Sequence, residues 1–316
     1  MTPLRDADRP LLGLTLMLGF CILAPFGDAL AKMLGGTLPT GQLVLLRFAF
    51  QAAILVPIMV LSRRRWQMSP RAWRFTALRT VFHILGITLM FTSLIYLPLA
   101  DAIAIAFVMP FILLLLGYWL LAEEVGWRRI AACAVGFTGT LLVIQPAFED
   151  VGWPALLPLG VAFLFAGFML STRVIAREVD PIGMQAISAL MATAILLPMV
   201  FLAPRSFDAL LAWQSPDGAQ WRLIAAMGLA GTLAHLLMTW SLRFAPASTL
   251  APVQYLEIPV ATVIGYLLFA DLPNPLASLG IMITVGAGLY IILRERAIAA
   301  HLARPSQAPP GKTPAG

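Results

Sequence analysis

The sequence predicts an all-α membrane protein with ten transmembrane helices arranged as two inverted five-helix repeats. Three observations support this fold class. Of the 316 residues, 60% are hydrophobic and only 11% are charged, whereas a soluble domain needs a charged surface. Ten apolar runs are long enough to cross a bilayer. The second half of the chain also resembles the first half, as described below.

Each predicted helix is a run of largely apolar residues close to the length of about 20 that a transmembrane helix needs. The connections between the runs are too short to hold a soluble domain. In chain order, the expected helices are residues 11–31, 42–61, 78–96, 100–121, 128–146, 154–173, 183–203, 221–242, 247–269 and 276–293.

The first run also fits a secretory signal peptide. Arg5 and Arg9 precede it, and the small residues at 29–31 resemble a cleavage site. We favour a retained first helix, because a comparable run at 154–173 lies in the middle of the chain, where no signal peptide can be.

Basic residues between the runs predict the orientation, because Lys and Arg resist translocation. If the N-terminus is cytoplasmic, the inner segments carry 17 basic residues and the outer segments carry three, which are Lys32, Arg205 and Arg222. Both termini are therefore expected in the cytoplasm, with the protein in the cell inner membrane. The high isoelectric point does not indicate nucleic-acid binding, since the basic residues cluster where orientation signals belong.

The chain is expected to divide into two repeats with a short segment at each end. The C-terminal segment is basic and rich in proline, a composition that cannot pack a core. The predicted parts are a cytoplasmic N-terminus at 1–10, a first five-helix repeat at 11–146, a second at 154–293 and a disordered cytoplasmic tail at 294–316.

The repeat is visible in the residues themselves. Residues 85–122 align with 233–270 at a constant offset of 148, with ten identities. An odd number of spans in each copy places the second copy upside down in the membrane, an arrangement found in many secondary transporters. The identities that are not aliphatic include Met90/Met238, Ser93/Ser241, Pro98/Pro246, Gly117/Gly265 and Tyr118/Tyr266.

The two segments LIYLPLADAIAIAFVMPFILLLLGYWLLAEE and LRFAPASTLAPVQYLEIPVATVIGYLLFAD resemble the paired signatures of the EamA-type drug/metabolite transporter superfamily. Asp271 departs from the Glu that is usual there, and Glu123 is its counterpart. The resemblance covers about residues 11–293 and implies two five-helix units. It also implies a central cavity framed mainly by the first, third, fourth, sixth, eighth and ninth helices, with the fifth and tenth peripheral.

Polar residues present in only one copy are the candidates for function, because the shared scaffold does not require them. Glu257 aligns with Met109, and Gln254 aligns with Ala106. An acid at the bilayer centre costs about 2.5 to 3.5 kcal/mol on insertion scales, so Glu257 should contact a solute or carry a proton. The alternative is a protonated Glu257 that bonds a neighbouring helix.

Arg47 in the second run is also unmatched. We expect a structural ion pair with Asp28 at a similar depth, in preference to direct recognition of an anionic group, because an unpaired buried guanidinium is costly. Gln51, one turn further along, could extend this pair into a network. Asp101 is expected to cap the fourth helix at its N-terminus.

Histidine and aromatic residues complete the candidate site. His235 could line the cavity and carry protons, because its unperturbed pKa is about 6.5. His83 is expected to form hydrogen bonds in the core. Trp240, Tyr255 and Phe107 could stack on a planar solute, with core packing as the alternative. No metal site is expected, because neither histidine has a second ligand at metal spacing.

We predict a secondary active transporter that moves a small organic metabolite by alternating access, driven by a proton or solute gradient. The sequence holds no nucleotide-binding loop and no metalloprotease or triad motif, so neither an ATPase nor another enzyme is expected, and no cofactor. Candidate solutes are amino acid derivatives and nucleoside-like or flavin-like cofactors, with the lipid bilayer as surroundings. The alternatives are a lipid-carrier flippase and, less favoured, an intramembrane enzyme.

Overall fold

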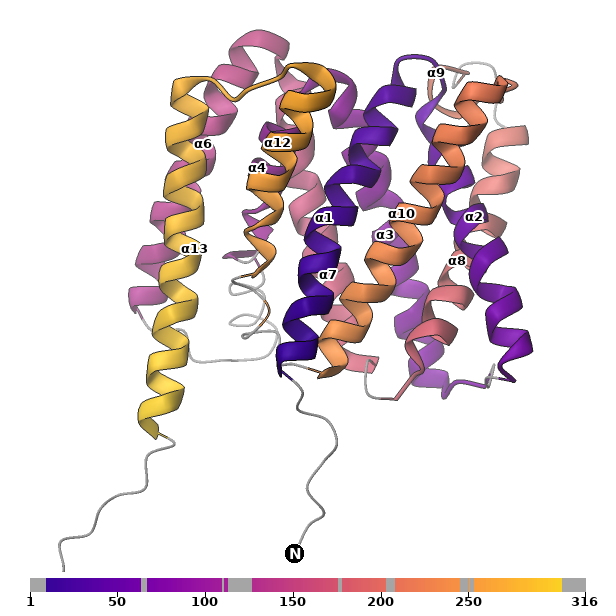
Figure 1. Ribbon diagram of the computed structural model, residues 1–316, viewed down its shortest axis with the longest axis horizontal. Coiled ribbons are helices and arrows are strands. Elements are labelled where there is room, and N and C mark those ends of the chain that lie inside the picture. The colour runs from indigo at the N-terminus through magenta and orange to yellow at the C-terminus, as the bar shows by residue number, and fades with distance from the viewer. Residues whose placement is uncertain are drawn as a thin grey trace, which may run out of the picture.

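A computed structural model describes residues 10–63, 67–109, 111–112, 127–175, 178–202, 208–244, 250 and 253–302. All regular secondary structure in this part of the chain is helical (Figure 1). The helices are α1 (Pro10–Gly35), α2 (Thr40–Leu61), α3 (Pro70–Tyr96), α4 (Leu99–Ala106), α6 (Trp127–Val151), the short 3₁₀ helix η1 (Trp153–Leu156), α7 (Leu157–Ile175), α8 (Pro181–Leu202), α9 (Asp208–Leu211), α10 (Gly218–Phe244), α12 (Glu257–Phe269) and α13 (Pro275–Leu302).

The protein is an all-helical, multi-pass membrane protein. Within the described residues, seven helical segments are long and apolar enough to cross a membrane: α1, α2, α3, α6, η1 with α7, α8 and α10. Large apolar side chains such as Phe163 and Leu202 are exposed on the outside of these helices. Such a surface suits lipid, because a helix satisfies its backbone groups internally and can present an apolar exterior.

Several helices extend beyond the predicted apolar runs. The third begins at Pro70 instead of residue 78, since the Ser69 side chain accepts a hydrogen bond from the Ala72 backbone N–H at 3.1 Å and Pro70 occupies the first helical position. The last continues to Leu302 instead of ending at 293. Parts of the expected helices, residues 113–121 and 247–249 with 251–252, lie outside the described residues, as does Glu123.

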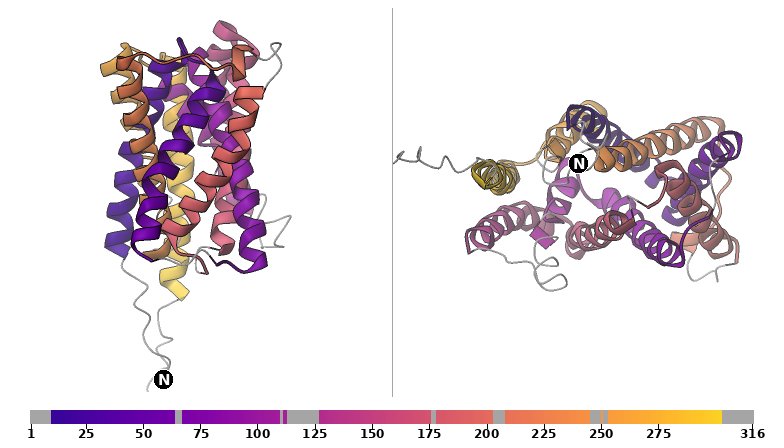
Figure 2. Two further views of the ribbon diagram at one scale, coloured as in Figure 1. Left: turned by 90° about the vertical axis from the view of Figure 1, so that its right-hand side faces the viewer. Right: turned by 90° about the horizontal axis from the view of Figure 1, so that it is seen from below.

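The main helix pairs each join one half of the chain to the other. α1 packs along α10, α3 along α7, α2 along α8, and α6 along α13, while α4 contacts α12 (Figures 1 and 2). In Figure 1, α1, α3 and α6 run from the lower to the upper end of the molecule, whereas α7, α10 and α13 run downward. The α6–α13 pair stands to one side of the other helices (Figure 2).

Glycines allow α6 and α13 to approach closely. A Cβ atom at Gly139 would lie 2.7 Å from the Gly280 carbonyl oxygen and 2.8 Å from the Thr284 backbone nitrogen. The Thr284 hydroxyl donates to the Gly136 carbonyl oxygen at 3.2 Å across the same contact. Small residues at such a crossing let two membrane helices pack backbone to backbone.

Candidate functional site

Two helices are interrupted at matching positions of the repeat. α4 ends at Ala106 and is followed by a turn at residues 107–108, and a turn at residues 255–256 precedes α12. These turns are separated by 148 residues, which is the repeat offset. Interrupted helices in corresponding positions of two repeats indicate where a transporter binds its solute.

A cavity lies at the level of these interruptions. Its wall is formed by α1, α2, α3, α4, α7, α10 and the start of α12, and it is mostly apolar. The cavity has a volume of about 120 Å³, whereas a single water needs only about 10 to 15 Å³. The cavity therefore has room for a small organic molecule.

Two carboxylates face this cavity. Asp28 comes from α1, and Glu257 is the first residue of α12, where an acidic side chain is favoured by the helix N-terminus. Both side chains are partly buried. Neither forms a hydrogen bond or an ion pair with any other described residue. Gln254 lines the same wall, directly before the turn at residues 255–256.

Arg47 lines the cavity from α2, opposite in charge to the two acids. The side chain is 3% exposed, and its Nη1 donates to Gln51 Oε1 at 3.2 Å. Its Nη2 lies 2.9 Å from His235 Nδ1 and 3.4 Å from the Gly231 carbonyl oxygen. The guanidinium is thus held by α2 and α10. Arg47 and Asp28 do not form the predicted ion pair. Arg47 contacts these neutral groups instead.

Behind Arg47, a buried network of neutral polar groups fixes its partners. Gln51 Nε2 donates to Gln185 Oε1 at 3.1 Å, and Gln185 Nε2 donates to the Thr239 hydroxyl at 2.9 Å. His83 Nε2 lies 3.0 Å from His235 Nε2. This network joins α2, α3, α8 and α10. It agrees with a hydrogen-bonded core position for His83, whereas His235 is at the cavity wall.

The aromatic candidates occupy different surroundings. Phe107 lines the cavity, and its ring centroid lies 5.3 Å from that of the buried Tyr255. Trp240 packs against an apolar cluster that includes Leu55 and Met59. Among the described residues, the cavity wall does not include Gln51, Tyr255 or Trp240. Sequence reasoning missed Gln185, although an amide within an apolar span is the signal that could have revealed it.

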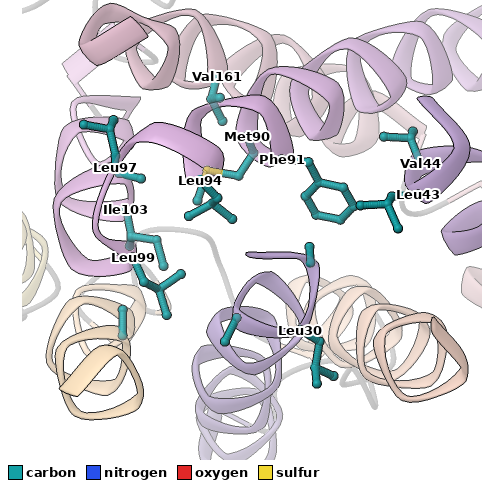
Figure 3. Packing of buried hydrophobic residues seen from close by; sticks show 14 of the residues in the cluster. Leu30, Leu43, Val44, Met90, Phe91, Leu94, Leu97, Leu99, Ile103 and Val161 are labelled. Carbon is teal, nitrogen blue, oxygen red and sulfur yellow. The ribbon is translucent and has the colours of Figure 1, made fainter. Parts of the chain in front are cut away.

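An apolar cluster, called the plug below, adjoins the cavity and extends toward the helix ends at the top of Figure 1. Its side chains converge from α1, α2, α3, α4 and α7 (Figure 3), and each is at most 8% exposed. Some also line the cavity, while others lie nearer the upper helix ends. The plug consists of Leu30, Leu43, Val44, Met90, Phe91, Leu94, Leu97, Leu99, Ile103 and Val161.

A polar contact ties the two halves together above the plug. Lys32 Nζ, at the end of α1, lies 3.0 Å from Asp271 Oδ2 and donates to the Leu97 carbonyl oxygen at 2.7 Å. Asp271 thus pairs with a lysine of the first half. Asp101 is the third residue of α4, whose cap position is Pro98, and its buried Oδ1 has no hydrogen-bond partner among the described residues. Asp101 Oδ1 therefore does not form the expected capping hydrogen bond at the N-terminus of α4.

Comparison with known proteins gives consistent matches. The EamA-like transporter family matches residues 11–145 and 152–294. An S-adenosylmethionine uptake transporter of Rickettsia felis is 25% identical over 269 residues, which cover 85% of this chain and 88% of the relative. A riboflavin transporter of Rhizobium johnstonii is 30% identical over 225 residues, or 71% of each chain. A solved crystal structure has a similar fold, with a TM-score of 0.61 and 19% identity over 91% of this chain and 97% of the other.

Proposed function

Because the chain belongs to the EamA-like transporter family, we propose that it moves its solute by alternating access around the cavity that contains Asp28, Arg47 and Glu257. The protein is a transporter of small metabolites and not an enzyme, as its named relatives are transporters. The candidate solutes are an amino acid derivative such as S-adenosylmethionine, or a nucleoside-like or flavin-like cofactor such as riboflavin. The names of the relatives support both classes.

The proposed architecture is ten transmembrane helices in two inverted five-helix repeats, 11–146 and 154–293. The helix pairs support a two-fold relation between the repeats. α1 pairs with α10 while its counterpart α7 pairs with α3, the counterpart of α10. α2 pairs with its own counterpart α8, and α6 with α13. Counterpart helices also run in opposite directions (Figure 1). Exchange of the two repeat conformations would open the cavity to each side in turn.

The apolar plug and the Lys32–Asp271 pair support a conformation closed toward the upper end. The basic residues favour the cytoplasm for the lower end, where α1 begins and α13 ends (Figure 1). We therefore assign the upper end to the outer side of the cell inner membrane. Opening toward that side requires the plug residues to separate.

Coupling to a proton is proposed for the two carboxylates. Unpaired acids inside a membrane protein are costly when charged. A proton on Asp28 or Glu257 removes that cost when the solute is absent, and the solute can replace the proton. Such an exchange would link transport to a proton gradient.

The single observation that carries the proposal is a cavity, at the matching helix interruptions, lined by two carboxylates and a guanidinium that form no ion pair with any described residue. The test is uptake into proteoliposomes of radiolabelled S-adenosylmethionine and of riboflavin. Glu257→Gln should lower uptake of the transported solute at least about tenfold, because a charged contact is worth about 1.5 to 3 kcal/mol.

The matched control for this test is Glu178→Gln, which removes an acid that is 43% exposed in a surface pair with Arg71. This control should leave uptake unchanged. Equal uptake by wild type and Glu257→Gln, with the same pH dependence, would remove Glu257 from the mechanism.

The inverted topology has its own test. Single cysteines at Gly36 and Glu178, both exposed, mark the turn after α1 and the turn after α7. A membrane-impermeant thiol reagent should label Gly36→Cys only from outside whole cells and Glu178→Cys only in inside-out vesicles. Labelling of both from one side would contradict the inverted repeat.

A further inference from the structure

We propose that the solute carries both an anionic group and at least one cationic group, the anion binding Arg47 and the cation binding between Asp28 and Glu257. This inference rests on the proposed function and names the substrate class of the same cavity. It selects a zwitterionic amino acid derivative, and above all one with a second cationic centre, over an uncharged flavin-like solute.

The two acids of the cavity form no ion pair. Asp28 and Glu257 belong to helices α1 and α12, which pack against each other. Both line the cavity, and neither has a hydrogen bond or ion pair with another described residue. A buried acid is stable as a charged group when it is paired and hydrogen-bonded, and otherwise it takes up a proton and becomes neutral. A cationic group of the solute would supply the missing partner.

The basic side is anchored but not saturated. A guanidinium has five N–H donors and does not lose its proton in proteins. Arg47 uses at most three donors, toward Gln51, the Gly231 carbonyl and His235. At least two donors remain for a ligand, and all three partners are neutral or weakly basic. No described residue gives this guanidinium a carboxylate hydrogen-bond partner. An anionic group of the solute would supply one.

The charges also set the preferred net charge of the solute. When both acids are ionised, two carboxylates and one guanidinium leave the cavity with one unbalanced negative charge, and a proton on either acid removes it. A solute with two cationic centres and one carboxylate, such as a sulfonium amino acid, balances it. A simple zwitterion balances it only when one of the two acids is protonated. An uncharged solute supplies no group of opposite charge to any of the three side chains, in a wall that is otherwise mostly apolar.

The rest of the wall fits an apolar or planar body between the two charged ends. Phe20, Phe107 and Phe165 line the cavity from α1, the α4 interruption and α7. Aromatic faces attract cations as well as planar rings. They therefore suit a cationic centre attached to a flat ring system.

The closing experiment measures binding of four probes that share one body but differ in charge, together with riboflavin. S-adenosylmethionine carries a carboxylate, an ammonium and a sulfonium. S-adenosylhomocysteine lacks the sulfonium charge, decarboxylated S-adenosylmethionine lacks the carboxylate, and 5′-methylthioadenosine lacks the amino acid portion. Affinity for the detergent-purified wild type is measured by equilibrium binding at neutral pH, and uptake is measured in proteoliposomes.

For the wild type, S-adenosylmethionine should bind most tightly. Loss of the carboxylate should weaken binding about 30-fold or more, because it leaves a buried charge without a partner. Arg47→Gln should remove this difference, so that S-adenosylmethionine and its decarboxylated form bind alike. Asp28→Asn and Glu257→Gln should instead reduce the difference in binding affinity between S-adenosylmethionine and S-adenosylhomocysteine.

The controls are Arg71→Gln and Glu178→Gln, which remove the same charges at an exposed pair and should change no affinity. If Arg47→Gln does not fold, Arg47→Lys keeps the charge and should keep the preference for the carboxylate, and the wild-type series stands without any variant. Tight binding of riboflavin or 5′-methylthioadenosine, or absence of binding by every probe with both charges, would overturn the proposal.

The two proposals fail differently in this experiment. Uptake of riboflavin without any charge preference would support transport and reject the charge assignment. Charge-dependent binding without uptake would support the charge assignment and reject transport.

Discussion

Two buried arginines lie in different surroundings in this protein, because Arg47 lines the cavity and Arg79 does not. By our proposal, Arg47 binds the solute and Arg79 is structural. Arg47 is 3% exposed and lines the cavity. Arg79 on α3 is 0% exposed and heads the largest fully buried side chains. Its Nε donates to the Thr172 hydroxyl at 2.9 Å and its Nη1 to the Ser188 hydroxyl at 2.6 Å. The guanidinium lies 4.5 Å from the Phe168 ring centroid.

Burial by itself therefore does not identify a functional charge in a membrane protein. Neither arginine has an acidic partner among the described residues. Arg79 joins α3 to α7 and α8 through two hydroxyls and an aromatic face, an arrangement that stabilises the helix seam. Arg47 is instead fixed by neutral groups behind it and turns toward empty space. Neutralising Arg79 should therefore lower stability, and neutralising Arg47 should lower transport.

The largest expected effect is on uptake by Arg47→Gln. Loss of a buried charge pair with the solute costs about 2 to 5 kcal/mol, so uptake should fall at least about 30-fold. The melting temperature of the purified protein should change little, since glutamine can keep part of the network with Gln51 and His235. Radiolabelled uptake and thermal melting are measured on the same preparation. Normal uptake by Arg47→Gln would contradict the claim that Arg47, unlike Arg79, acts in transport.

Arg79→Ala should show the reverse pattern. It leaves a void in place of a large buried side chain, and such core truncations cost about 2 to 5 kcal/mol. The melting temperature should fall by about 5 to 15 °C. Uptake per folded molecule should stay within about threefold of wild type, a rough bound on indirect effects. A large loss of uptake with unchanged melting would place Arg79 in the transport mechanism.

A smaller effect is expected from the peripheral pair of helices. Gly139→Val would push a side chain into the backbone of α13 near Gly280, and overpacking of this kind costs about 1 to 3 kcal/mol. The melting temperature should drop while uptake per folded protein is retained, because α6 does not contribute described residues to the cavity wall. Gly218→Val, at a position with nothing within 4 Å, is the control.

The smallest effect is expected at the polar contact above the plug. Lys32 and Asp271 are 17% and 33% exposed, and such pairs contribute about 0 to 1 kcal/mol. Lys32→Gln should shift the balance toward the upper-open conformation by at most about fivefold. The rate at which an impermeant thiol reagent labels Ala24→Cys from outside should rise accordingly. A matching rise in Asp271→Asn, with no further rise in the double variant, would assign the effect to the pair.

The apolar runs correctly predicted an all-helical, multi-pass membrane protein, because a bilayer requires long apolar segments, and seven such segments are found in the described residues. They could not predict helix ends, since a helix continues into water wherever a cap supports it. Ser69 and Pro70 extend α3 in this way, and the four-residue helix α9 lies outside any apolar run. The sequence predicted one helix at 247–269, and the turn at residues 255–256 before Glu257, which matches the turn after α4, became visible only in three dimensions.

The candidate site was predictable in part. The comparison of the repeats identified Glu257 and Gln254, and both line the cavity. The partners of Arg47 could not be derived, because the choice between Asp28 and the groups on α10 depends on side-chain directions that spacing does not give. His235 lies 188 residues from Arg47 in the chain, yet the two side chains meet at 2.9 Å.

The most direct test of the central claim is protection of cavity cysteines by the solute. In a cysteine-free background, Ala24→Cys and Ala106→Cys line the cavity from α1 and α4, and Ala219→Cys is exposed at the start of α10. Saturating S-adenosylmethionine, or whichever probe binds most tightly, should slow alkylation of the two cavity cysteines at least about fivefold and leave Ala219→Cys unchanged. Equal alkylation of the cavity cysteines with and without bound solute would contradict the account.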